Sequence, residues 1–290
     1  MNKRKIDYVG YLYIAPALAF FVLFMAYPML FVVRTSFFEW DGFSAQKIFV
    51  GLNNYIQIYK RGYLLTALRN FAVFFIFTVP LQMLLGMIFA SMLTKRTLLY
   101  KIAKSIFFIP VIMTPIIIGY VFSNILEMNF GLLNVTLRNI GLGFLAQNWT
   151  GSPGTAMFTI IAVSVWQGMG FSLVMYIAGI VAIPTEVNDA CNVDGANAFV
   201  QFWRITFPLL RSTHATLLIL GAIGSLKVFD IIWVLTGGGP GTATASFSTL
   251  ILKESFDAYK QGTSSALSVV LIICAVIITW IQLRFIKTEH

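Results

Sequence analysis

The sequence predicts an all-α integral membrane protein with about six transmembrane helices. Of its 290 residues, 58% are hydrophobic and only 11% are charged, and the mean hydropathy is +0.84. A soluble domain carries about a quarter charged residues, so water is not the main solvent of this chain. Six runs are long and apolar enough, at about twenty residues each, to cross a bilayer.

The six runs define the expected topology. They are roughly 9–33, 71–93, 105–126, 156–183, 213–236 and 264–285. The first run is too long for the apolar core of a signal peptide and has no obvious cleavage site, so it is expected to be retained as a span. We expect residues 1–290 to form a single transmembrane domain.

Basic residues suggest which side each loop faces. With alternating spans, the N-terminal tail, the second loop, the 184–211 segment and the C-terminal tail share one side. The basic residues on that side are Lys3, Arg4, Lys5, Lys95, Arg96, Lys101, Lys104, Arg204, Arg211, Arg284 and Lys287. Lysine and arginine accumulate in cytoplasmic loops. Although the first outer loop is itself basic, both termini and the 184–211 segment are predicted to be cytoplasmic.

The 184–211 segment has the pattern of two short helices joined by a turn. Thr185 is expected to cap a helix that runs to about residue 192, and Asp194-Gly195 is a strong turn signal, because glycine accepts a positive φ. A second helix is expected from Ala196 to about Arg204. Its aromatic side chains have no core of their own to cover them, which favours a docking surface for another protein.

The same segment resembles the EAA loop of the membrane subunits of binding-protein-dependent ABC importers. That family pattern is Glu-Ala-Ala, three residues, Gly, nine residues, Ile, one residue and Leu-Pro. Here Asp189-Ala190-Cys191 is followed by Gly195, Ile205 and Phe207-Pro208, with every spacing kept. The chain departs from the pattern at Asp189, Cys191 and Phe207.

The resemblance covers nearly the whole chain and is closest to the sugar-importing branch. Ala15-Pro16-Ala17, Trp40-Asp41-Gly42 and Val228-Phe229-Asp230 are similar to segments of the larger membrane subunit of the maltose transporter. It implies the type I ABC importer permease fold, a heterodimer with a sister permease, two cytoplasmic ATPase subunits and an extracytoplasmic solute-binding protein, in a bacterial or archaeal cell membrane. The implied ATPase-coupling residues are Glu186, Asp189, Ala190, Asp194, Gly195, Ala196, Phe199, Phe202, Ile205 and Pro208.

Charged residues in the fifth run mark a second candidate site. Lys227 and Asp230 stand at i, i+3 spacing, which places both on one helix face, where they can pair with each other. Ionisable groups inside a bilayer usually face a bundle interior or a wet cavity. Pairing and substrate contact are both open interpretations, and in the second Phe229 or Trp233 offers an aromatic face to a sugar ring.

No enzymatic or metal site is expected. The nearest lookalike of a phosphate-binding loop, residues 237–242, lacks the lysine that such loops carry. ATP and Mg²⁺ are therefore expected on separate ATPase subunits. The polar span residues expected to hydrogen-bond neighbouring helices are Asn70, Gln82, Gln167, Ser172 and Ser268.

The predicted function is a permease subunit for a carbohydrate, with an oligosaccharide favoured. A glycerol-phosphate-type substrate is an alternative within the same family, since Lys227 suits an anion. An ion-driven secondary transporter is an alternative from another class, and it predicts inverted repeats and a coupling carboxylate, for which Asp230 is the candidate. A membrane scaffold is a third, and it needs no polar groups in the fifth run.

Overall fold

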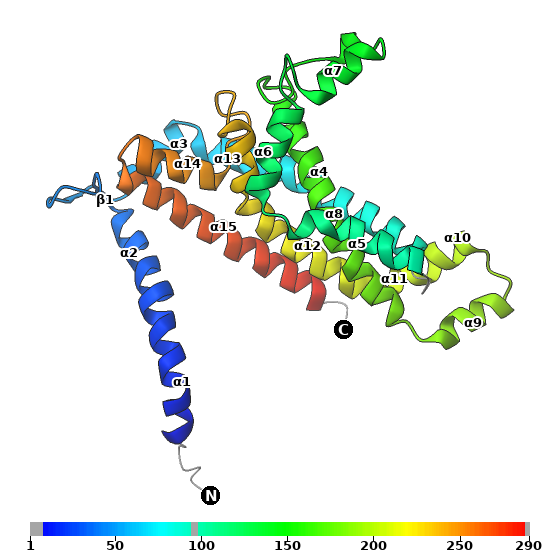
Figure 1. Cartoon of the computed structure of the whole chain (residues 1–290). Coiled ribbons are helices and arrows are strands. Elements are labelled where there is room, and N and C mark those ends of the chain that lie inside the picture. Colours follow the sequence, from blue (N-terminus) through cyan, green and yellow to red (C-terminus); the bar gives the residue numbers. More distant parts are fainter. Residues whose placement is uncertain (1–7, 94–97, 288–290) are drawn as a thin grey trace, which may run out of the picture. The chain divides into compact units, whose positions relative to one another are not determined.

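The computed structural model describes residues 8–93 and 98–287, and helices dominate it (Figure 1). It divides into two compact units. One contains the residues up to Leu64 with Leu250–Ile272, and the other contains Leu65–Thr249 with the residues from Ile273 onward. Lys3, Arg4, Lys5, Lys95 and Arg96, which contribute to the predicted orientation, lie outside the described residues.

The first unit begins with an apolar helical stretch and continues into a pair of short strands and a short helix. Its elements up to residue 60 are α1 (Tyr8–Phe21), the π-helical turn η1 (Val22–Ala26), α2 (Tyr27–Thr35), β1 (Phe38–Glu39), β2 (Ile48–Phe49) and α3 (Asn53–Lys60). The two strands are antiparallel, with Phe38 opposite Phe49. The buried Asn54 amide donates to the carbonyls of Ser36 and Phe38, and so fixes α3 to the strand. The Arg61 guanidinium forms a 3.1 Å ion pair with Glu254.

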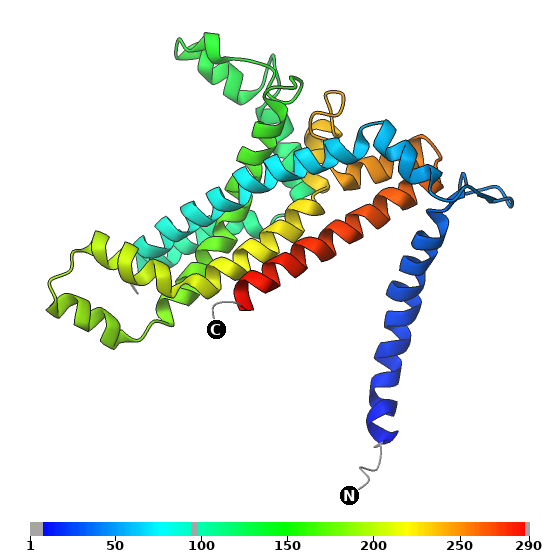
Figure 2. The same ribbon diagram turned by 180° about the vertical axis from the view of Figure 1, so that it is seen from behind.

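The remaining helices follow along the chain. They are α4 (Tyr63–Met92), α5 (Leu98–Ile112), α6 (Pro115–Ile125), α7 (Leu132–Asn139), the 3₁₀ turn η2 (Gly143–Leu145), α8 (Ala156–Val181), α9 (Thr185–Val193), α10 (Ala198–Gln201), the π-helical turn η3 (Phe202–Thr206), α11 (Phe207–Leu209), α12 (Arg211–Leu226), α13 (Asp230–Thr236), α14 (Phe247–Leu252), the π-helical turn η4 (Lys253–Asp257) and α15 (Gln261–Lys287). In both views, α9 and α10 project beyond the ends of α8 and α12 (Figures 1 and 2).

Helix α8 lies at the centre of the second unit. It contacts α5, α12 and α13, and Ile160, Leu173 and Tyr176 along it are almost fully buried. A small residue allows α8 to approach α5 closely, because a Cβ at Gly170 would collide with the Phe107 carbonyl of α5. Close packing at small residues is the usual basis of helix association in a bilayer.

The predicted all-α membrane fold is confirmed. Four single helices are long and apolar enough to cross a membrane, and two bent pairs bring the total among the described residues to as many as six. The first pair, Ile102–Ile112 and Pro115–Ile125, bends by 96°. Thr114 caps the second helix of this pair, accepting from the Ile117 N–H at 3.4 Å, and Pro115 starts it. Proline suits the first position of a helix because the backbone N–H that it lacks would have no partner within the helix there.

Three expected runs differ in the structure. The run 105–126 is divided between α5 and α6 at the 96° bend. The second helix begins at Tyr63, eight positions before the expected residue 71, because the polar Thr66, Arg69 and Asn70 continue the helix instead of preceding it. The fifth run, 213–236, is not one helix: α12 ends at Leu226 and α13 starts at Asp230. That residues 1–290 act as a single transmembrane domain stays a prediction.

Candidate functional site

The 184–211 segment forms the predicted pair of helices joined by a turn. Helix α9 ends in a Schellman-type cap, in which the Ala196 N–H donates to the Cys191 carbonyl at 3.0 Å while Gly195 adopts φ +68°. The predicted turn at Asp194-Gly195 is confirmed. Within α9, the Cys191 thiol is buried and donates to the Val187 carbonyl at 2.9 Å.

The second helix of the segment starts two residues later than expected and runs further. Asn197 was missed as its cap: the Asn197 Oδ1 accepts from the Val200 N–H at 2.8 Å. Asparagine before an apolar turn is a common cap signal. The helix then passes through η3 and ends with α11 at Leu209, where it meets α12 at a bend of 63°.

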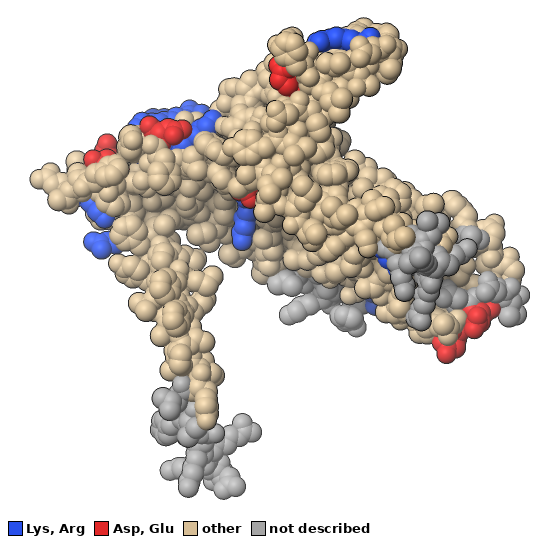
Figure 3. All heavy atoms as spheres, viewed as in Figure 1, with Lys and Arg blue, Asp and Glu red and all other residues tan. Residues whose placement is uncertain are grey.

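Exposure separates the predicted coupling residues into two groups. The exposed group is Glu186, Asp189, Ala190, Asp194, Gly195, Phe199 and Pro208, and the half-buried group is Ala196, Phe202 and Ile205. Figure 3 shows the acidic side chains gathered over α9. Beyond them, the Phe199 side chain is 72% exposed and Trp203 is 45% exposed. Phe202 instead packs against a buried cluster that includes Leu173 and Tyr176.

The second candidate site is a cavity of about 410 Å³ at the break between α12 and α13. Lys227, Phe229 and Asp230, which the sequence analysis placed on a possible substrate path, are among the residues that line it. Trp233 is not among the lining residues, but its ring stacks on Phe229 at a centroid distance of 5.6 Å. The volume falls in the range of about 300–1,000 Å³ that ligand sites occupy.

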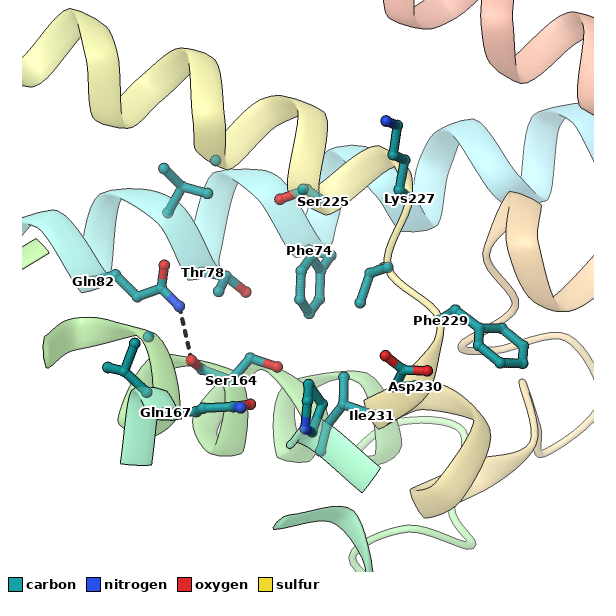
Figure 4. A pocket seen from close by; sticks show the side chains of 17 residues that line it. Phe74, Thr78, Gln82, Ser164, Gln167, Ser225, Lys227, Phe229, Asp230 and Ile231 are labelled. Carbon is teal, nitrogen blue, oxygen red and sulfur yellow. Dashed lines mark hydrogen bonds between the residues drawn. The ribbon is translucent and has the colours of Figure 1, made fainter. Parts of the chain in front are cut away.

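Of the two interpretations left open for Lys227 and Asp230, the structure contradicts their mutual pairing. Lys227 is the residue after the last turn of α12, and Asp230 opens α13, so the i, i+3 face never forms. Two serines hold the break open: the Ser248 hydroxyl donates to the Lys227 carbonyl at 3.2 Å, and the Ser246 hydroxyl to the Val228 carbonyl at 2.8 Å. The two charged side chains extend in different directions (Figure 4), and no ion pair joins them.

Polar side chains of α4 and α8 complete the cavity wall (Figure 4). The Gln82 amide donates to the Ser164 carbonyl at 2.7 Å, and the Gln167 amide to the Met113 carbonyl at 3.2 Å. The expected bond of Gln82 to a neighbouring helix is confirmed, whereas Gln167 bonds the link between α5 and α6. The same expectation is wrong for Ser268, whose hydroxyl donates to the Ser264 carbonyl of its own helix. Both glutamines also border the cavity, which the sequence did not indicate.

Two buried hydroxyl groups of this wall have no hydrogen-bond partner among the residues that the structure describes. Thr78 is 3% exposed and Ser164 is 9% exposed, and their side-chain oxygens are buried. A buried hydroxyl left without a partner costs about 1–3 kcal/mol. Neither residue carried a functional signal in the sequence, because threonine and serine are common inside spans. Together with Gln82, Gln167 and Asp230, they give the cavity the polar groups to bind a ligand that both donates and accepts hydrogen bonds.

Comparison with known proteins decides the family. The model of the family described as "Binding-protein-dependent transport system inner membrane component" matches residues 82–288. The chain belongs to this family. It is thus an integral membrane protein and a transport subunit, as the predicted resemblance implied.

Relatives match over nearly the full length. A probable ABC transporter permease protein, YurN of Bacillus subtilis, is 34% identical over 99% of this chain and 98% of its own. The trehalose/maltose transport system permease protein MalF of Thermococcus litoralis is 33% identical over 95% of this chain and 92% of its own. Among solved structures, a bacterial ABC transporter that imports the acidic polysaccharide alginate matches with a TM-score of 0.84 at 21% identity, covering 97% of this chain and 96% of its own. This last likeness confirms the predicted type I importer fold.

Proposed function

We propose that this protein forms, with a sister membrane subunit, the translocation path for a carbohydrate delivered by an extracytoplasmic solute-binding protein. The observation that carries the proposal is the cavity between α4, α8 and the α12–α13 break, with its unpartnered Thr78 and Ser164 hydroxyls. Sugar hydroxyls donate and accept, so they match both groups. The trehalose/maltose permease among the relatives supports the same substrate class.

Transport is powered, in this proposal, by two cytoplasmic ATPase subunits that bind ATP and Mg²⁺. The 184–211 segment is the surface that seats on one of them, because it projects from the bundle and presents the Phe199 and Trp203 side chains to solvent. Exposed aromatic side chains at a projecting helix typically mark a protein interface. The segment and both chain ends then face the cytoplasm of a bacterial or archaeal cell.

An anionic substrate is the second candidate. Lys227 lines the cavity. The ion pair found among the described residues joins Arg61 to Glu254, so no described carboxylate pairs with the Lys227 ammonium. An unneutralised ammonium suits a carboxylate or phosphate group on the ligand, as in an acidic oligosaccharide or a glycerol phosphate. The ion-driven alternative, which requires Asp230 to couple a proton or Na⁺, has no support from the family membership.

Reconstitution tests the proposal. The chain is co-expressed with the products of its neighbouring genes, purified as a complex and placed in vesicles with binding protein. We expect uptake of at least one labelled oligosaccharide that depends on ATP and persists without an ion gradient. A panel of neutral and anionic oligosaccharides separates the two substrate classes. Uptake that follows a proton or Na⁺ gradient without ATP contradicts the proposal.

A further inference from the structure

A histidine joins the 184–211 segment to the central helix α8. His214 lies in the first turn of α12, and its Nδ1 is 2.8 Å from the Tyr176 hydroxyl of α8. Its Nε2 is 3.1 Å from the Phe207 carbonyl in α11. One imidazole therefore contacts three helices at the 63° bend where the segment meets the span.

The chemistry of the two partners fixes the direction of both hydrogen bonds. A backbone carbonyl only accepts, so His214 Nε2 carries the proton and donates to Phe207. In a neutral imidazole the other nitrogen then accepts, and the Tyr176 hydroxyl donates to it. Tyr176 is 1% exposed, so its bond to His214 is not readily exchanged for one to water.

Aromatic rings continue this link to the exposed end of the segment. The centroid distances are 6.3 Å from Phe199 to Trp203, 5.3 Å from Trp203 to Phe207, 4.6 Å from Phe207 to His214 and 5.3 Å from His214 to Tyr176. The series starts at the exposed Phe199 and ends at the buried Tyr176. A displacement of the outer rings thus has a contiguous set of contacts through which to reach α8.

We propose that His214 is a positioning residue that transmits movement of the 184–211 segment to α8, and so to the wall that carries Ser164. The inference rests on the proposed coupling of this segment to an ATPase. Without the imidazole bridge, the bend between α11 and α12 is free to absorb the movement. The motor then continues to hydrolyse ATP while the cavity no longer responds.

The test reads cavity accessibility and needs no knowledge of the substrate. Gly224 lines the cavity and nothing lies within 4 Å of a Cβ added there, so Gly224→Cys is a reporter that the fold accommodates. The two native cysteines, Cys191 and Cys274, are first replaced by alanine and serine. Labelling of the reporter by a water-soluble maleimide is measured in the assembled complex, without nucleotide and after trapping with ATP and vanadate. ATP hydrolysis is measured on the same samples.

Two variants break the bridge at different atoms. Tyr176→Phe removes only the hydroxyl that donates to His214 Nδ1. His214→Gln removes the imidazole ring but keeps an amide donor for the Phe207 carbonyl. Thr216→Ala is the matched control, because the Thr216 hydroxyl donates to the Ser212 carbonyl of its own helix and so does not link α12 to another element. We expect each bridge variant to reduce the nucleotide-dependent change in labelling by about fivefold or more, as expected for the loss of a coupling interaction, with ATP hydrolysis within about twofold of the parent.

The double variant adds a second criterion. Because Tyr176→Phe and His214→Gln break the same bridge, the double variant is expected to be no worse than either single variant. An unchanged labelling response in both single variants overturns the inference. A parallel loss of labelling response, ATP hydrolysis and complex yield overturns it as well, since that pattern belongs to a merely structural residue. If the parent complex itself shows no response to nucleotide, the proposed coupling fails and the inference falls with it.

Discussion

Replacement of Gly195 tests the effect of backbone strain alone, because a side chain there is strained by the positive φ but meets no neighbouring atom. Gly195 has φ +68°, in the left-handed region, and nothing lies within 4 Å of a Cβ added to it. Alanine there costs about 1–2 kcal/mol, whereas asparagine tolerates the left-handed region. Valine is branched at Cβ and costs more than alanine. We therefore expect transport activity to decrease in the order Gly, Asn, Ala, Val at position 195.

The cost acts on the turn and leaves the bundle intact. The segment is exposed and has no core of its own, so strain at Gly195 rearranges α9 and α10 locally without unfolding the spans. A penalty of 1–2 kcal/mol lowers the ratio of native to rearranged turn by a factor of about 5 to 30. ATPase co-purified with the chain, and ATP-driven uptake, should fall by up to this factor in Gly195→Ala. The amount of chain in the membrane should not change.

Gly141 provides a control of equal strain at another place. It has φ +81°, and nothing lies within 4 Å of its added Cβ, but it lies between α7 and η2, outside the 184–211 segment. Gly141→Val should leave ATPase co-purification unchanged. Equal function of Ala, Val and Asn at position 195 would refute the reasoning, as would loss of the ATPase from Gly141→Val.

The cavity and the loop beside it yield three further predictions. Thr78→Val removes a buried hydroxyl that has no partner, so the melting temperature should stay or rise while the KM for sugar uptake rises; a lowered melting temperature contradicts this. Lys227→Ala and Asp230→Asn should have additive effects on uptake, since no ion pair joins them, and strong non-additivity in a double-mutant cycle would restore the pairing. The Asn70 amide donates to the carbonyls of Thr242 and Ala245, so Asn70→Leu should destabilise the protein by about 1–3 kcal/mol, seen as a lower melting temperature, and no change argues against these bonds.

Features set by neighbouring residues were predictable from the sequence. The turn at Gly195 follows from local backbone preference, and the apolar runs follow from the length of chain that a bilayer requires. The turn signal at Asp194-Gly195 and the helical spacing of the aromatic residues after it placed both helices of the 184–211 segment within a few residues. These features depend on a short stretch of chain, and the stretch carries their signal.

Features set by distant residues were not predictable. The sequence predicts a single span over 213–236, but the helix breaks at Lys227, where hydroxyl groups of Ser246 and Ser248 bind the freed carbonyls. Thr78 and Ser164 look like ordinary span residues, and only the packing of α4 against α8 shows that they border a cavity without partners. The bridge at His214 likewise joins residues 38 positions apart.

The contact of the 184–211 segment with an ATPase is the central claim, and crosslinking from Phe199 tests it most directly. A photo-reactive phenylalanine analogue at position 199 replaces a side chain that is 72% exposed, so the fold is not disturbed. The complex is irradiated in native membranes and the adducts are identified by mass spectrometry. The account predicts a crosslink to a nucleotide-hydrolysing subunit. A crosslink to an extracytoplasmic binding protein instead, or an adduct with lipid alone in a complex that transports normally, would contradict it.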